Sequence, residues 1–344
     1  MMQLQETFKA LEMKGEELVL IDQRLLPTCE QDFICRSSED VFHAIRDMVV
    51  RGAPAIGGVA GYGVWFAARQ ARGDMDLFDR LCAHLVDARP TAVNLEWAVR
   101  RVSAVAKATS MDLDAIRREA DRIVEEDIAM NHRIGEIGSR IVPPGATILT
   151  HCNTGALATC GWGTALGVIK TAYGQGKVAH VYADETRPRL QGARLTAWEL
   201  VKAGIPATLI PDSAAATLIR DGRIDCVILG ADRITADGDV ANKLGTFALS
   251  VICRRYGVPF YSAAPTTTID FDTPHGSMIP IEERDGSEVT HIGDVRVAPE
   301  GIGVYNPSFD VTPHENITGI ITECGILEEP YDVAIADLRK RLGR

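Results

Sequence analysis

The stretch PPGATILTHCNTGALAT, residues 143 to 159, marks a change in the character of the chain. Before it, apolar residues three or four apart run from about 112 to 140 and predict a long amphipathic helix, which Pro143, Pro144 and Gly145 end. After it, short apolar segments alternate with helical patterns, and ATILTH at 146–151 is the first of these segments. We interpret the long helix as the connector between two domains.

The second half of the chain has the pattern of a parallel sheet. Strands that alternate with helices are typical of βαβ units and predict a doubly wound, Rossmann-like sheet. The predicted strands are ATILTH (146–151), VAHVYA (178–183), ATLI (207–210), CVILG (226–230) and VPFYSAA (258–264).

The first part of the chain is mostly helical. An early predicted strand at 17–23 is followed by helical patterns at about 38–50, 55–71, 76–88 and 93–108. We therefore predict an α/β protein. Its smaller, mostly helical N-terminal domain, with a few strands, covers residues 1–125, and its Rossmann-like α/β domain covers residues 126–344.

The composition of the chain limits which classes of partner we expect it to bind. The chain has 344 residues, of which 46% are hydrophobic and 24% charged, as in soluble globular proteins. A formal net charge of -11 disfavours a nucleic-acid or anionic-membrane surface and favours a small ligand in a pocket. Without a signal peptide or an apolar run of membrane-spanning length, the chain is expected to be cytoplasmic. Its eight cysteines have no zinc-ligand spacing and read as reduced thiols.

Polar residues follow the predicted strands, where doubly wound sheets bind their ligands. Cys152 precedes a predicted helix whose N-terminus would favour anions and lower the pKa of the thiol, although a buried cysteine that only packs stays an alternative. Asp232 comes just after a buried strand that ends at Gly230, at the rim of the sheet, where an apolar surround would raise its pKa and suit it to acid–base work. The simpler alternative makes Asp232 a cap or an ion-pair partner of Arg233.

Other polar residues could hold a phosphate. Arg51 lies in VVRGAPAIGG (49–58), where a guanidinium and nearby backbone amides could share one. Asn242 and Lys243 come near the start of a predicted helix and could contact a phosphate there. Simpler readings stay open: a loop between helices for Arg51, a helix cap for Arg89 and a solvated loop for Gln191.

Six long segments resemble, in order and spacing, the motifs of the methylthioribose-1-phosphate isomerase family. They are RGAPAIG, RPTAVNL, THCNTGALAT, DETRPRLQGARLTAWEL, GADRITADGDVANKLGT and NPSFDVTP. The resemblance covers about residues 15–330. This family is related to the regulatory subunits of the guanine-nucleotide exchange factor of translation initiation.

The resemblance implies roles for particular residues. The family's catalytic cysteine and aspartate fall on Cys152 and Asp232, a pair that the regulatory relatives generally lack. Thr154 and Asp237 depart from the residues that other members often carry, and neither bears a catalytic role. The substrate contacts of the family fall on Arg51, Gly52, Ala53, Arg89, Gln191, Asn242 and Lys243.

The resemblance also implies an activity. We expect an aldose–ketose isomerase of methionine salvage that converts 5-methylthioribose 1-phosphate to 5-methylthioribulose 1-phosphate in the cytoplasm, as a homodimer. We expect a sugar phosphate as its partner, without nucleic acid, membrane, metal or other cofactor. Two alternatives stay open: a ribose-1,5-bisphosphate isomerase and a non-catalytic regulatory subunit on the same fold.

Overall fold

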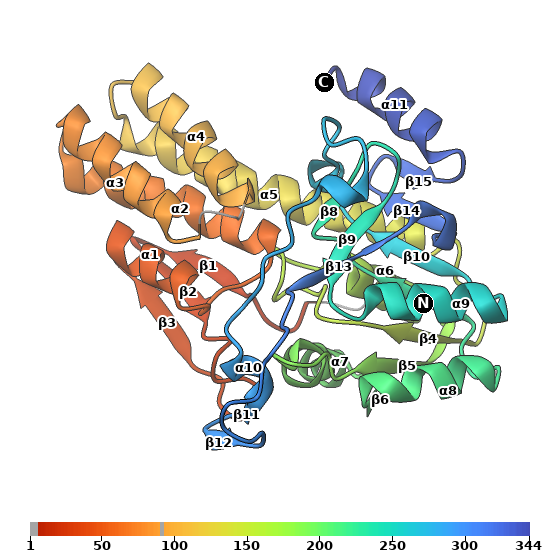
Figure 1. Cartoon of the computed structure of the whole chain (residues 1–344). Coiled ribbons are helices and arrows are strands. Elements are labelled where there is room, and N and C mark those ends of the chain that lie inside the picture. The colour runs from red at the N-terminus through yellow and green to blue at the C-terminus, as the bar shows by residue number, and fades with distance from the viewer. Residues whose placement is uncertain (1–5, 90–92) are drawn as a thin grey trace. The chain divides into compact units, whose positions relative to one another are not determined.

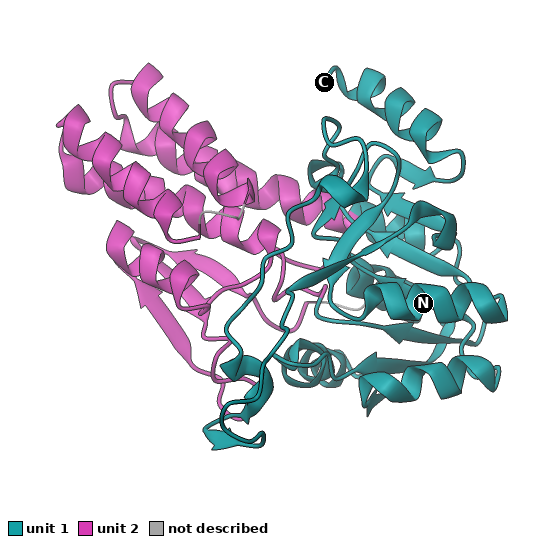
Figure 2. Cartoon of the chain, in the orientation of Figure 1, with its two compact units in different colours: residues 1–4, 133–153, 164–344 teal, residues 5–132, 154–163 magenta. Residues whose placement is uncertain are grey.

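The computed structural model describes residues 6–89 and 93–344, which divide into two compact units (Figure 2). The N-terminal unit holds the described residues up to 132 together with residues 154–163, and the sheet unit holds residues 133–153 and 164–344. The sequence analysis put one change of domain at residues 125 and 126. In the structure the described chain passes between units after residues 132, 153 and 163.

The N-terminal unit combines a small antiparallel sheet with helices. Its three strands pair in the order β1–β2–β3, and the helices α1 to α4 follow with the first part of α5. Apolar side chains cover nearly every side of α2, which makes it the central helix of this core. The bounds are β1 Leu11–Lys14, β2 Glu17–Ile21, β3 Asp32–Cys35, α1 Ser38–Arg46, α2 Ala53–Ala71, α3 Met75–Asp87, α4 Val93–Ala108 and α5 Leu113–Gly138.

The sheet unit is built on a seven-stranded sheet in the order β15–β14–β10–β7–β4–β5–β6 (Figure 1). All neighbouring strands are parallel except the edge pair β14 and β15. The bounds are β4 Ala146–Thr150, β5 Val178–Asp184, β6 Ala207–Ile210, β7 Cys226–Leu229, β10 Phe260–Ala263, β14 Gly319–Thr322 and β15 Gly325–Leu327.

Helices cover both faces of this sheet because strand residues alternate between two hydrophobic cores. In β4, Ile148 packs with α6, whereas Leu149 packs with α8, α9 and α11. The prediction of a doubly wound, Rossmann-like sheet is confirmed. The bounds are α6 Ala165–Gly174, α7 Ala197–Lys202, α8 Ala215–Arg220, α9 Thr246–Tyr256 and α11 Tyr331–Leu342.

A second, three-stranded antiparallel sheet follows the carboxyl end of β7. It pairs β13 (Phe309–Thr312) with β9 (Val240–Lys243), and β9 with β8 (Arg233–Ile234). The small elements α10 (Ser287–Thr290), β11 (His291–Ile292) and β12 (Val295–Arg296) lie between β10 and β13 in the chain. The sequence analysis did not predict this second sheet, because its strands are short and mix polar with apolar residues.

Most predicted elements are confirmed within a few residues, but one local prediction is wrong and one strand was missed. No helix follows Cys152 directly, because residues 154–163 join the other unit and α6 begins only at Ala165. Asn242 and Lys243 come just before α9, which begins at Thr246, as predicted, but they lie in strand β9, which was not predicted. Among the described residues, no helix is long and apolar enough to cross a membrane.

Candidate active site

The strand order brings the two predicted catalytic residues to one place in the sheet unit. The strands β5 and β6 follow β4 in order on one side of it, and the next strand, β7, lies on the other side of β4. Leu149 of β4 pairs with Val227 of β7, so the carboxyl ends of these strands are neighbours. Cys152 follows β4 and Asp232 follows β7. A reversal of strand order of this kind is where doubly wound sheets form their ligand crevice.

Cys152 occupies a tightly held and strained turn. Its backbone N–H donates to Thr186 Oγ1 at 2.9 Å, and its carbonyl accepts from Thr196 Oγ1 at 2.5 Å. Its φ of +62° lies in the left-handed region, which L-residues other than glycine rarely adopt. The side chain is 9% exposed. Such strain, held by buried hydrogen bonds, is typical of functional positions.

Lys243 places a positive charge near Cys152, where the sequence analysis expected the N-terminus of a following helix to act on the thiol. Burial lowers the pKa of Lys243, and the negative charges of Cys152 and Asp232 act in the opposite direction. The three side chains are therefore close enough to interact electrostatically. The Lys243 ammonium donates to the carbonyl of Ser308 at 3.0 Å and lies 5.3 Å from the centre of the Phe309 ring.

Asn242 is the neighbour of Lys243 on β9. Its side-chain amide donates to Thr246 Oγ1 at 2.9 Å, and that hydroxyl donates to the carbonyl of Lys243 at 2.7 Å. This closed set of bonds joins the end of β9 to the first turn of α9. The amide of Asn242 is thus held within the sheet unit close to the residue that interacts with both predicted catalytic groups.

The environment of Asp232 differs from the one that the sequence analysis expected. The apolar wall predicted around its carboxyl is not found, because the side chain is exposed in the structure. Its backbone N–H donates to the carbonyl of Ala241 at 2.9 Å, which extends the β8–β9 pairing and projects the side chain from the rim of the sheet. Arg233, the alternative ion-pair partner, has its guanidinium 3.6 Å from the carboxylate of Asp270.

The side-chain oxygen of Gln191 is buried and accepts no hydrogen bond from the described residues. The residue is 8% exposed, and no described group donates a hydrogen bond to its Oε1 atom. It precedes a π-helical turn at Gly192–Thr196 that lies directly on β5: a Cβ on Gly192 would stand 1.7 Å from the carbonyl oxygen of Asp184. A buried acceptor left without a donor costs about 1–3 kcal/mol, which a bound hydroxyl or water would offset.

The remaining predicted contacts belong to the N-terminal unit. Arg51, Gly52 and Ala53 lie at the start of α2, where the positive end of the helix dipole and a guanidinium suit an anion, and the N–H of Ala55 in the same turn donates to the carbonyl of Ala158 at 3.3 Å. Gly52 has a φ of +94°, and a Cβ there would be 2.3 Å from the carbonyl oxygen of Ala158. Arg89 follows α3, and its backbone N–H donates to the carbonyl of Val86 at 3.3 Å. The residues after it, 90–92, are outside the described part.

A buried histidine–aspartate pair beneath the turn was missed from the sequence. His151 Nδ1 lies 2.9 Å from Asp184 Oδ2, and His151 Nε2 lies 3.0 Å from the carbonyl oxygen of Leu244. Asp212 is nearby, with its two carboxylate oxygens accepting from the backbone N–H groups of Thr186 and Arg187, both at 2.7 Å. Polar residues at the ends of three different strands were visible in the sequence, but their contacts depend on tertiary structure.

Two groups of His and Asp residues have the spacing of metal ligands. The ligand atoms of His151, Asp184 and Asp212 lie within 4.8 Å of one another, and so do those of Asp237, Asp239 and His314. In both groups hydrogen bonds engage the atoms: Asp239 Oδ1, for example, accepts from the backbone N–H of His314 at 2.9 Å and lies 3.0 Å from its Nδ1. These donors are arranged as hydrogen-bond networks. All eight cysteines are free thiols.

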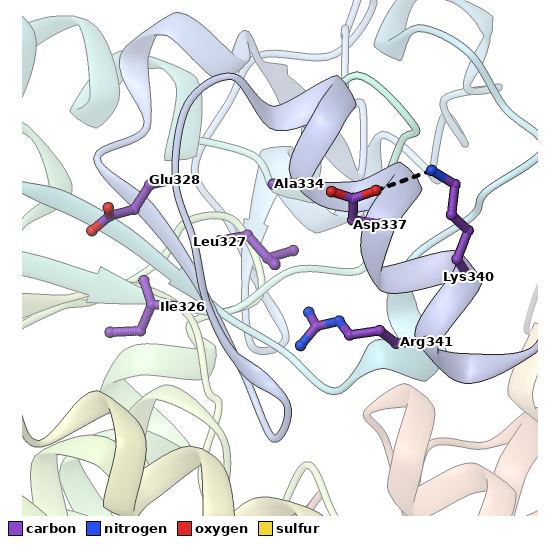
Figure 3. A pocket seen from close by; sticks show the side chains of 7 residues that line it. All are labelled: Ile326, Leu327, Glu328, Ala334, Asp337, Lys340 and Arg341. Carbon is purple, nitrogen blue, oxygen red and sulfur yellow. Dashed lines mark hydrogen bonds and ion pairs between the residues drawn. The ribbon is translucent and has the colours of Figure 1, made fainter.

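A surface hollow in the sheet unit lies away from these residues, between β15 and α11 (Figure 3). In it, the Lys340 ammonium pairs with Asp337 Oδ1 at 3.1 Å. β15 is the edge strand, separated from β7 by β14 and β10, so this hollow is distinct from the carboxyl ends of β4 and β7. Its lining residues are Ile326, Leu327, Glu328, Ala334, Asp337, Lys340 and Arg341.

Comparison with known proteins gives the family. Residues 49–329 match the initiation factor 2 subunit family. The methylthioribose-1-phosphate isomerase of Thermoanaerobacter sp. (strain X514) is 57% identical over 341 residues, covering 96% of this chain and 99% of that protein. The protein of the same name from Koribacter versatilis is 49% identical over 340 residues, with 96% of each chain covered.

Solved structures agree with this relationship. The crystal structure of 5-methylthioribose 1-phosphate isomerase from Pyrococcus horikoshii OT3 is 43% identical, with a TM-score of 0.92, and the match covers 97% of this chain and 96% of that one. A structure from A. fulgidus described as subunit delta of translation initiation factor eIF-2B is 40% identical, with a TM-score of 0.89 and coverage of 97% and 99%. The chain therefore belongs to the initiation factor 2 subunit family and, within it, to the isomerase branch that the methylthioribose-1-phosphate isomerases represent.

Proposed function

We propose that this protein converts 5-methylthioribose 1-phosphate to 5-methylthioribulose 1-phosphate, a step of methionine salvage, and that Cys152 and Asp232 perform the chemistry. The observation that carries the proposal is 57% identity over 96% of the chain to a curated relative of that name. The sheet unit is consistent with it, because Cys152 and Asp232 follow adjacent strands and both interact electrostatically with Lys243.

The reaction has a particular obstacle. The phosphate on the anomeric oxygen prevents ordinary opening of the sugar ring to a free aldehyde. An acid must protonate the ring oxygen so that its bond to C1 breaks, and hydrogen must then move from C2 to C1. Asp232 is the proposed acid. Its exposed carboxyl would gain a raised pKa only when the substrate excludes water and brings the phosphate charge near.

Cys152 then acts on the opened sugar. In one route its thiolate removes the proton from C2, and the electron pair forms the C1–C2 double bond of an enol phosphate. Cys152 then returns a proton to C1 while the C2 hydroxyl gives its proton to the Asp232 carboxylate, which yields the ketone. In the other, hydride moves directly from C2 to C1 and Cys152 stabilises the charge that develops. Lys243 serves both routes, because its positive charge stabilises a neighbouring thiolate.

Deuterium at C2 separates the two routes. Substrate labelled there and turned over in ordinary water should lose label to solvent if Cys152 abstracts a proton that exchanges. Complete retention of label at C1 supports the hydride route. Mass spectrometry of the ketose product gives the ratio directly.

Two substitutions test the residue assignments. Cys152→Ser should lower kcat by orders of magnitude with little change in KM or melting temperature, and Cys226→Ser, at a buried cysteine in the middle of the sheet, is the matched control. Asp232→Asn should lower kcat about 10²–10⁴-fold, the usual contribution of a general acid. Near-normal turnover of either variant would remove that residue from the chemistry.

The substrate contacts are also proposals. We assign the phosphate and hydroxyl groups of the sugar to Gln191, Asn242 and Lys243 in the sheet unit, and to Arg51, Gly52, Ala53 and Arg89 in the N-terminal unit. The donor-less buried oxygen of Gln191 supports its part in this set. Comparing kcat/KM on 5-methylthioribose 1-phosphate, 5-deoxyribose 1-phosphate and ribose 1,5-bisphosphate tests the specificity, because a second phosphate requires additional positive charge in the site.

A non-catalytic subunit is the second candidate. The A. fulgidus structure described as subunit delta of eIF-2B favours it, since 97% of this chain matches that protein at 40% identity. Turnover of 5-methylthioribose 1-phosphate by the purified protein decides between the two.

We also propose that the protein is a cytoplasmic homodimer. Phe247 and Val251, one helical turn apart on α9, are 43% and 44% exposed, and apolar side chains of this kind suit a contact between copies. Sedimentation analysis of the wild type and of Val251→Glu tests the dimer and the involvement of this helix.

A further inference from the structure

We propose that His151 is a positioning residue for the reaction, and that its buried imidazole joins the backbone that carries Cys152 to the backbone that carries Lys243. The inference rests on the proposed function, because it assigns His151 a role relative to those two residues. It concerns a side chain that neither the motif resemblance nor the comparisons assign to the site.

The geometry of the link is direct. His151 immediately precedes Cys152, and Leu244 immediately follows Lys243. The Nε2 atom of His151 lies 3.0 Å from the carbonyl oxygen of Leu244, across 93 residues of chain. Gly245 closes over the same ring, since a Cβ on it would stand 2.9 Å from His151 Cε1 and 3.1 Å from Nε2. Any movement of the ring therefore moves the end of β9.

Asp184 holds the ring in one orientation. Its Oδ2 atom lies 2.9 Å from His151 Nδ1, and both side chains are only 1% exposed. The carbonyl oxygen of Asp184 also accepts a hydrogen bond from Thr186 Oγ1 at 3.2 Å, and this hydroxyl accepts from the backbone N–H of Cys152. One aspartate thus supports both the imidazole and the strained turn at Cys152.

The hydrogen bonds restrict where the protons lie. A carbonyl oxygen only accepts, so the Nε2 atom of His151 carries a proton. The proton between Nδ1 and Asp184 belongs to one group or the other, and in either case the pair has no net charge. The hydrogen bond and charge of Asp184 raise the pKa of His151 against the opposing effect of burial, and burial also raises the pKa of Asp184. The link between the two backbones is the same in both forms.

The functional consequence follows from the position of Lys243. Its ammonium interacts with the charges of Cys152 and Asp232, so the spacing of β4 and β9 at their carboxyl ends sets the strength of those interactions. Displacements of about 1 Å in an active site cost on the order of 100-fold in rate. Removing the imidazole releases that spacing without changing any residue proposed to touch the substrate.

His151→Leu and His151→Gln test the inference together. Leucine removes both hydrogen bonds, whereas the glutamine amide retains a donor for the carbonyl of Leu244. We expect His151→Leu to lower kcat about 100-fold on 5-methylthioribose 1-phosphate and His151→Gln to lower it less. If His151→Leu does not fold, the glutamine variant still tests the link.

A second readout needs no substrate. The rate of alkylation by iodoacetamide, measured against pH and resolved by peptide mass spectrometry, reports the thiolate of Cys152. Its profile should shift to higher pH in His151→Leu, because the Lys243 charge moves away from the thiol. Cys29 and Cys324 are exposed in the same chain and serve as internal references.

The control separates positioning from stability. Ile148→Val shortens a fully buried side chain of β4 and should lower the melting temperature, while kcat, KM and the alkylation profile of Cys152 stay unchanged. The inference is wrong if both His151 variants keep the wild-type kcat and alkylation profile, or lose activity only in proportion to their unfolded fraction. A shifted profile in a protein that does not turn over the sugar phosphate would support the positioning and refute the proposed function.

Discussion

Replacing Gly245 by alanine should lower both the stability and the turnover of this protein, and the structure gives a magnitude for each. The glycine is the N-cap of α9 and has a φ of +108°, where an alanine costs about 1–2 kcal/mol. Its new Cβ would lie 2.9 Å from His151 Cε1, whereas ordinary carbon contacts are about 3.5 Å. The imidazole or the end of β9 must therefore move by about 0.6 Å.

That displacement predicts the kinetic effect. Since a full ångström of misplacement costs on the order of 100-fold, we expect kcat of Gly245→Ala to fall roughly 10-fold. The stability loss corresponds to a decrease in melting temperature of about 2–8 °C. Initial-rate assays on 5-methylthioribose 1-phosphate and thermal unfolding followed by circular dichroism measure the two effects on the same preparation.

Gly257 offers a matched control at the other end of the same helix. It is the C-cap of α9 with a φ of +70°, and an added Cβ would meet nothing within 4 Å. Gly257→Ala should therefore lose about 1 kcal/mol of stability and keep its turnover. If Gly245→Ala turns over as fast as Gly257→Ala, contact with the His151 ring does not control the site and the reasoning is refuted.

Three further predictions address other parts of the molecule. Gly52→Ala should lose about 3 kcal/mol of stability, because its Cβ would lie 2.3 Å from a backbone carbonyl oxygen. The control Gly73→Ala, at nearly the same φ but with open space around it, should lose about 1 kcal/mol, and equal melting temperatures for the two variants would contradict this. Gln191→Leu should raise KM at least tenfold with little loss of stability, since it removes a buried oxygen that has no described donor; an unchanged KM would exclude Gln191 from substrate binding. Burial lowers the pKa of His314, but the hydrogen bond that its Nδ1 donates to Asp239 Oδ1 and the charge of that carboxylate raise it overall. His314→Gln should therefore destabilise the protein more at pH 5.5 than at pH 8.5, and chemical denaturation that shows an equal loss at both would contradict this.

The sign of the last prediction follows from linkage. A histidine whose pKa is higher in the folded state binds its proton more tightly there, so its stabilising effect is complete below the unfolded pKa of about 6.5. The effect disappears as the pH rises through the folded pKa. His180→Gln, at a histidine of β5 that bonds Thr208 at 2.9 Å, is the control for the substitution itself.

Much of the fold could be predicted because its strands and helices are locally distinct. The apolar segment 226–230 and the helical pattern 93–108 match β7 and α4 within one residue, since burial on both sides of a parallel strand and on one face of a helix leaves a clear pattern in the chain. The short strands β8, β9 and β13 were missed, because two to four residues of mixed polarity carry no clear pattern and β13 pairs with β9 from far away in the sequence.

The same distinction between local pattern and long-range contact applies to the candidate site. The sequence by itself determined which residues follow the strands, and with the motif resemblance it singled out Cys152 and Asp232. Only the tertiary structure decided that β7 lies beside β4, that residues 154–163 leave the sheet unit, that the Asp232 side chain is exposed and that His151 contacts Leu244. The physical reason is that hydrophobic patterning acts over a few residues, whereas strand order, solvent exposure and buried hydrogen bonds depend on segments that meet only when the whole chain has folded.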